Sequence, residues 1–165
     1  MRVHGRGGAG SSTPSGWPVN YYGNSGDTSA RAISLNGVDV VGFALYASLT
    51  FAHISFGVFT ADGVNLYDVG IYNAAGALQA DIGPTHLPSN TYQTIATVQG
   101  AVTLAPGLYL FARTGNANTA QLYGGSGQCW VDAVNVAASV GGQLPASIPA
   151  QAVSPAFNGV TFALS

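Results

Sequence analysis

The chain has 165 residues, of which only 6% are charged, and its formal net charge is −2. It contains no lysine and no glutamate, so it lacks both the clustered cations that nucleic acids and anionic lipids require and the best charged helix formers. We therefore expect no nucleic-acid partner and an all-β fold, with Val, Ile, Thr, Tyr and Phe in strands between turns of Gly, Asn and Pro.

The first 16 residues differ in composition from the rest. Residues 1–16 are rich in Gly and Ser and have no apolar periodicity, which predicts a flexible arm that anchors the protein or contacts another subunit. We expect no signal peptide, because no apolar segment follows Met1, and no intrachain disulfide, because Cys129 is the single cysteine. Residues 17–165 are expected to form one domain.

From residue 17 onward, short apolar segments alternate with turn residues. In 42–51, for example, Phe43, Leu45, Leu49 and Phe51 share one parity, as in a strand with one buried face. The predicted strands are 31–36, 42–51, 53–60, 66–73, 77–82, 92–98, 101–104, 107–113, 119–123, 128–136 and 159–164. Strands of this length and spacing predict an antiparallel β-sandwich that is jelly-roll-like.

The charge-free segment 40–59 is as long as a membrane span. Its period-two alternation indicates strand instead, and we expect no membrane insertion. The side chains expected to point into the sandwich are Ile33, Leu35, Phe43, Leu45, Leu49, Phe51, Ile54, Phe56, Val58, Val69, Ile71, Ile95, Leu104, Leu108, Leu110, Trp130, Val134 and Phe162.

Motifs for catalysis and cofactors are weak. Residues 5–10 match G-x-G-x-x-G, but no strand precedes them and no helix follows. A glycosidase would need two aspartates as acid and base, and the aspartates lie in ordinary turn and strand segments. His53 and His86 have no third ligand at metal-binding spacing. We expect no catalytic residues, no metal and no cofactor.

Aromatic and amide side chains indicate a binding site more clearly than these motifs indicate catalysis. An aromatic ring packs on the apolar face of a sugar while amides bond its hydroxyls, which favours a neutral-glycan site. The candidate ligand-binding residues are Trp17, Tyr21, Tyr22, Asn116, Asn118, Gln121 and Tyr123. The alternative is that Trp17 and Tyr22 pack the arm onto the sandwich or onto an adjacent subunit.

Sheet edges pose a problem for this composition. Monomeric β proteins protect their edges with charged side chains, especially lysine, and this chain has no lysine and few other charged residues. We therefore expect a homo-oligomer in which neighbouring subunits cover the edges.

Three segments resemble a module of tailed-bacteriophage virion proteins. They are residues 66–78 (LYDVGIYNAAGAL), 94–98 (TIATV) and 102–112 (VTLAPGLYLFA), in which a VGIY-[ND]-x-x-G hairpin precedes a TL-x-[AP]-G-x-Y-x-x-A strand. Residues 54–58 and 144–148 are similar to neighbouring parts of that module. The resemblance implies a jelly-roll-like domain of a tail fibre, head fibre, spike or capsid decoration.

The same resemblance implies an oligomer, often a trimer, that decorates the particle or binds host cell-surface glycans. We therefore expect a non-enzymatic virion structural protein, made in the host cytoplasm and attached to other virion proteins through residues 1–16. The alternative is a stand-alone carbohydrate-binding module. A polysaccharide-degrading enzyme is disfavoured because no acid and base pair is evident.

Overall fold

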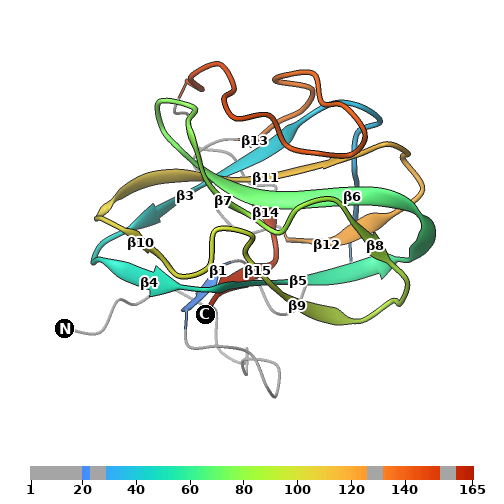
Figure 1. The fold of residues 1–165 in the computed structure, drawn as a ribbon, viewed down its shortest axis with the longest axis horizontal. Helices are drawn as coiled ribbons and strands as arrows, with labels where there is room; N and C mark the ends of the chain where they lie inside the picture. Colours follow the sequence, from blue (N-terminus) through green and yellow to red (C-terminus); the bar gives the residue numbers. More distant parts are fainter. Residues whose placement is uncertain (1–19, 23–28, 126–131, 153–158) are drawn as a thin grey trace.

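The fold is all-β, as the composition predicts. The structure is a computed structural model that describes residues 20–22, 29–125, 132–152 and 159–165, and within them every element is a strand paired in antiparallel sheets (Figure 1). The predicted arm 1–16 lies outside the described residues. The jelly-roll topology stays a prediction.

The first sheet is built around β5 (His53–Thr60). One side of β5 pairs with β9 (Tyr92–Ala96). It also pairs with β15 (Phe162–Leu164) and β12 (Gln121–Gly125). The sheet is extended by β1 (Asn20–Tyr22), which pairs with β15, and by β14 (Gly159–Val160) and β2 (Ala30–Ala32), which pair with β12.

The second sheet is built around β11 (Gly107–Gly115). This strand pairs along its length with β3 (Asp39–Leu45) and β6 (Asp62–Asn73). The sheet is completed by β13 (Asp132–Ala133), β7 (Leu78–Asp81) and β8 (Thr85–Leu87). A separate two-stranded ribbon joins β4 (Leu49–Phe51) and β10 (Val102–Leu104).

The main core lies between the two sheets, which form two layers in Figure 1. Phe162 of the first sheet stacks on Phe111 of the second, with ring centroids 4.3 Å apart, and meets Phe43 edge-on at 5.0 Å. All three side chains are buried. This packing of one sheet face on another is that of a β-sandwich.

A second, smaller core lies on the outer face of the second sheet. Residues 136–149, which we call the strap, cross this face and are the orange-red segment above β11 in Figure 1. Leu144 and Ile148 of the strap pack on Tyr72 and Leu110. Backbone bonds tie the strap to the sheet at both ends, from Val136 N to Val38 O and from Ile148 N to Gly76 O. The sheet is therefore buried on both faces.

Most predicted strands are present, with shifted ends. The predicted strand 42–51 is wrong as one element, because the chain leaves the second sheet after β3 and pairs again only as β4. Tyr46, between the two, is 70% exposed. Strand β6 begins at Asp62 rather than at residue 66, and β1 and β8 were not predicted. Predicted residues 128–131 lie outside the described part.

Most predicted core residues are buried, with informative exceptions. Leu35 and Val134 are 55% and 63% exposed, so their prediction is wrong. Neither residue lies in a strand of the structure, so period-two alternation does not govern their orientation. Leu110 is buried but packs under the strap, outside the main core. Leu49, Leu108 and Ile95 are only partly buried, and Trp130 lies outside the described residues.

Candidate functional site

The outer face of the first sheet carries a group of aromatic side chains centred on Gly57. Along β5, Ile54, Phe56 and Val58 are fully buried in the main core, so the residues between them face outward. Gly57 is one of these, and Tyr92 of β9 is its register partner. On the other side of β5, Val58 pairs with Leu122 of β12, which places the next residue, Tyr123, beside Gly57.

The two tyrosine rings close over this glycine. Their centroids are 5.8 Å apart with 24° between the planes, and Phe59 meets Tyr123 edge-on at 5.3 Å. A Cβ on Gly57 would lie 2.6 Å from the Tyr123 ring and 2.8 Å from the Tyr92 ring, so only glycine leaves room for both. We call Phe59, Tyr92 and Tyr123 the aromatic strip. Tyr92 remains 46% exposed.

Neutral polar side chains flank the aromatic strip. The Thr60 hydroxyl donates to Gln121 Oε1 at 2.8 Å, and Ser55 and Thr94 share a hydroxyl bond of 2.7 Å. Burial, and then the neighbouring Tyr123, raise the pKa of Tyr92, so its phenol stays protonated at neutral pH. The strip therefore offers ring faces together with hydroxyl and amide groups and carries no charge of its own.

The structure brings together two of the predicted site residues, Gln121 and Tyr123, on β12. Asn116 lies in the loop before β12, where its backbone N and its Oδ1 bond Leu66 O and Leu66 N of β6. Its side-chain oxygen thus holds the loop in place. Asn118 is exposed in the same loop.

The remaining predicted site residues precede β2. Tyr21 and Tyr22 lie in β1, opposite Ala163 and Phe162, and Trp17 lies outside the described residues. Sequence reasoning missed Phe59 and Tyr92. The outward parity of Tyr92 within predicted strand 92–98 could have indicated an exposed ring, but its meeting with Tyr123 depends on strand order.

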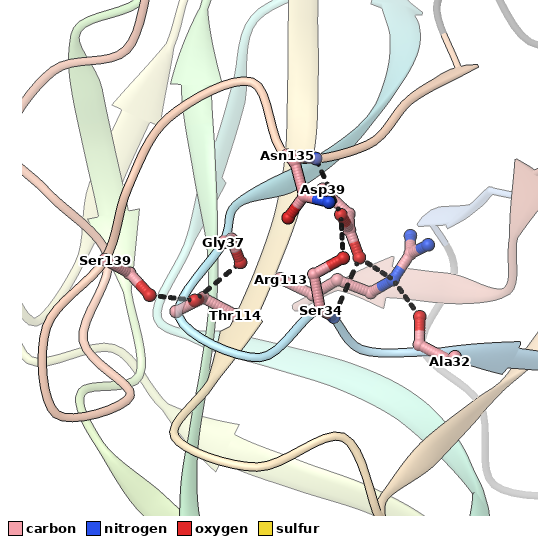
Figure 2. Close-up of polar contacts among 8 residues, drawn as sticks. All are labelled: Ala32, Ser34, Gly37, Asp39, Arg113, Thr114, Asn135 and Ser139. Atoms are coloured by element: carbon pink, nitrogen blue, oxygen red, sulfur yellow. Dashed lines mark hydrogen bonds and ion pairs between the residues drawn. The ribbon is translucent and has the colours of Figure 1, made fainter.

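A buried polar cluster joins the sandwich to its connecting loops (Figure 2). The Asp39 carboxylate accepts bonds from Ser34 N at 3.0 Å, Ser34 Oγ at 2.7 Å and Asn135 N at 3.0 Å. Arg113 Nε donates to Ala32 O and lies 3.8 Å from Asp39 Oδ2. Burial lowers the pKa of Arg113, and the Asp39 charge opposes that effect. The cluster cross-links β3, β11 and two loops.

A second carboxylate is held at the start of β6. Asp62 accepts a 2.6 Å bond from the Tyr67 hydroxyl and further bonds from Asn65 Nδ2 and from Val64 N and Asn65 N. These donors, Tyr67 foremost, hold the pKa of Asp62 well below its usual range. Asp62 is thus an ionised acceptor that shapes the turn into β6.

Comparison with known proteins identifies no relative: no protein-family model, no curated protein and no solved structure matches the chain. Among the described residues, no three His, Cys, Asp or Glu side chains gather in a way that could hold a metal ion. No helix in that part of the chain has the length and apolarity to cross a membrane.

Proposed function

We propose that this chain is a non-enzymatic structural protein of a tailed-phage particle that works as a homo-oligomer, as a fibre, spike or capsid decoration. The observation that carries the self-association is the open edge at β9. Among the described strands β9 pairs only with β5, and no charged residue occurs from residue 87 to residue 112. An edge without charge is a template for another strand, and a second copy would cover it.

The assignment to a phage particle rests on the resemblance. Its three segments lie on β6 with the first residue of β7, on β9, and on β10 and β11, and β11 and β6 are paired along seven residues. A trimer, attachment to other virion proteins through residues 1–16, and a place on the particle surface after synthesis in the host cytoplasm are parts of the same proposal.

The test is the mass of the protein in solution and its response to a charge at this edge. Light scattering of the purified chain is expected to give a multiple of 16.6 kDa. Ala96→Lys places a charge on the exposed part of β9 and is expected to shift the protein toward monomer. Ala74→Lys, in the exposed turn after β6, is the matched control and is expected to leave the mass unchanged.

A stable wild-type monomer would contradict the self-association. The virion assignment has a separate test, in which mass spectrometry of purified particles from the source of this sequence detects the chain. Deletion of residues 1–16 is expected to abolish attachment while leaving a folded sandwich, and attachment of the truncated chain would refute the anchoring role.

A second candidate function, binding of neutral carbohydrate, is favoured by the aromatic strip. The 46% exposed Tyr92 and the half-buried Tyr123 stacked on it suit the apolar C–H faces of a sugar, and the flanking hydroxyl and amide groups suit its hydroxyls. This function is compatible with a virion protein that adsorbs to host glycans and with a stand-alone carbohydrate-binding module. The virion protein is expected to be a homo-oligomer, whereas the carbohydrate-binding module would act as a single chain.

A glycan array of neutral oligosaccharides, followed by titration calorimetry on any hit, tests this function. Tyr92→Ala and Tyr123→Ala are each expected to weaken binding about tenfold or more, because each removes one of the two stacked rings. Tyr46→Ala removes a 70% exposed tyrosine outside the strip and serves as the control. An array without hits, or equal losses for all three variants, would exclude this function.

A further inference from the structure

Two aspartates meet beneath the strap on the outer face of the second sheet. Asp81 of β7 pairs in register with Gly70 of β6, so Asp68, two residues before Gly70, is its diagonal neighbour on the same face. The two carboxyl groups are within hydrogen-bonding reach of each other. Gly70 leaves the space for this pair, because a Cβ there would lie 3.0 Å from Asp81 Cβ and 2.8 Å from Leu144 Cδ1. Asp68 is fully buried and Asp81 is 4% exposed.

The hydrogen bonds around this pair leave one oxygen unmatched. Asp68 Oδ2 accepts a bond of 3.0 Å from Leu144 N of the strap. Asp81 Oδ1 accepts from Gln99 Nε2, and Gln99 Oε1 in turn accepts from Asp81 N at 3.0 Å. Asp68 Oδ1 is buried and has no hydrogen-bond partner. Two ionised carboxylates can only accept, whereas a proton between them would supply the missing donor.

Among the described residues, no lysine or arginine faces the pair, and His86 of β8 is exposed with its Nδ1 against Asn65 O. The strap has no titratable residue, and neither has the loop 97–100 that supplies Gln99. On β6 the neighbouring titratable group is Tyr72, whose hydroxyl donates to Pro145 O. On β11, Thr114 faces the strap through Ser139, while Arg113 points to the opposite side, toward Asp39. The surroundings thus favour one negative charge over two.

We propose that a proton shared between Asp68 and Asp81 holds the strap on the second sheet, and that the strap loosens as the pH rises. When the proton is lost, two buried carboxylates repel each other directly beneath Leu144, whose N–H is bonded to Asp68. Loosening of the strap would withdraw Leu144 and Ile148 from Tyr72 and Leu110 and expose an apolar face of the sheet.

The pKa values support the direction of this effect. Burial, together with the charge of Asp81, raises the pKa of Asp68 to about 8. In an unfolded or opened segment the pKa of an aspartate is near its ordinary value of 3.8. The closed form therefore keeps a proton that the opened form releases, so its stabilisation is complete below about pH 4 and is lost as the pH rises to about 8.

Hydrogen exchange on the whole chain, read by NMR or mass spectrometry and corrected for the intrinsic base-catalysed rate, tests this inference. We expect the protection of the Leu144 amide to fall about tenfold or more between pH 5 and pH 8 and to level off above pH 8. Protection of Phe111 in β11, whose backbone is paired on both sides, is the internal reference and is expected to change less.

Asp68→Asn is the matched variant, because an amide is nearly isosteric with a carboxyl group and can donate to Asp81 without titrating. We expect its Leu144 protection to be independent of pH over the same range. Asp62→Asn removes an aspartate whose hydrogen bonds are with Val64, Asn65 and Tyr67 rather than with the strap, and it is expected to keep the wild-type slope.

A flat Leu144 profile in the wild-type chain would overturn the proposal. The carboxyl carbon of Asp68, followed by NMR in the wild-type protein, gives a reading that needs no variant to fold. If this carboxyl group titrates near 4, no proton is held there at neutral pH and the inference fails.

Discussion

Arg113 of β11 lies directly opposite Asp39 of β3 in the register that joins these strands, and Arg113 Nε is 3.8 Å from Asp39 Oδ2. Both side chains are almost completely buried. The pair is not a simple ion bridge, because Asp39 also receives two bonds from Ser34 and one from Asn135 N. It joins the second sheet to the loops that enter and leave it.

Removal of one partner is expected to be costly. Asp39→Ala leaves the buried charge of Arg113 without its strongest electrostatic partner, although Asp132 still acts on it, and we expect the free energy of unfolding to fall by about 3–5 kcal/mol. Urea denaturation followed by tyrosine and tryptophan fluorescence measures it. Asp132→Ala, at a half-buried position on β13, is the control with a smaller loss. Equal losses for the two variants would show that the Asp39 cluster has no special role.

Asp62 makes the protein sensitive to acid. Its pKa is lowered in the folded state, so its stabilisation is complete above about pH 4, the usual aspartate range, and is lost as the pH falls below it. Tyr67→Phe removes the strongest donor and is expected to flatten the decline of stability between pH 4 and pH 2. Tyr109→Phe, which loses a hydroxyl bond to Ala105 O, is expected to keep the wild-type slope. Thermal denaturation across this range distinguishes them.

Gly57 is expected to be required for the geometry of the aromatic strip. The Cβ of Gly57→Ala would overlap both tyrosine rings, so they must move apart. We expect a folded protein whose carbohydrate binding falls as in Tyr92→Ala. Near-ultraviolet circular dichroism follows the rings, and calorimetry follows the ligand. Gly63→Ala, where the added Cβ makes only ordinary contacts with Pro88, is the control. Unchanged ring signals in Gly57→Ala would contradict this role.

Gly76 holds the end of the strap through both its conformation and its lack of a side chain. Its φ is +86°, and a Cβ there would lie 2.0 Å from Ile148 O, whose residue donates its N–H to Gly76 O. Gly100→Ala is a matched control, since its φ is +73° but nothing lies within 4 Å of the added atom.

We expect Gly100→Ala to cost about 1–2 kcal/mol from backbone strain alone and Gly76→Ala to cost clearly more. The additional loss of stability in Gly76→Ala is expected to appear as faster hydrogen exchange of the Ile148 amide. If both variants lose the same stability and Ile148 stays protected, close packing of the strap end is not required.

The sandwich could be predicted because its signals are local. Strand 53–60 was predicted with both ends correct, since alternating apolar residues reveal a half-buried strand wherever it pairs. The second sheet was harder to predict. Residues 39–45 and 109–115 are buried on both faces at nearly every position, because the strap covers the outer face. This burial hides the alternation that marks a strand end.

The candidate site was predicted only in half. Gln121 and Tyr123 lie on one strand, so their alternation indicated a shared face. Tyr92 lies about thirty residues away along the chain and reaches Tyr123 only because β5 lies between their strands with a glycine at the crossing point. No local pattern encodes that neighbour relationship.

The sequence by itself determined that this protein is all-β, because a chain without lysine and glutamate and rich in Gly, Val, Thr and Tyr favours extended strands at every step. Only the tertiary structure decided which distant residues meet, such as Tyr92 with Tyr123, Arg113 with Asp39 and Asp68 with Asp81. Strand order and the path of the strap are long-range choices, governed by which faces can be buried together rather than by the preference of any one segment.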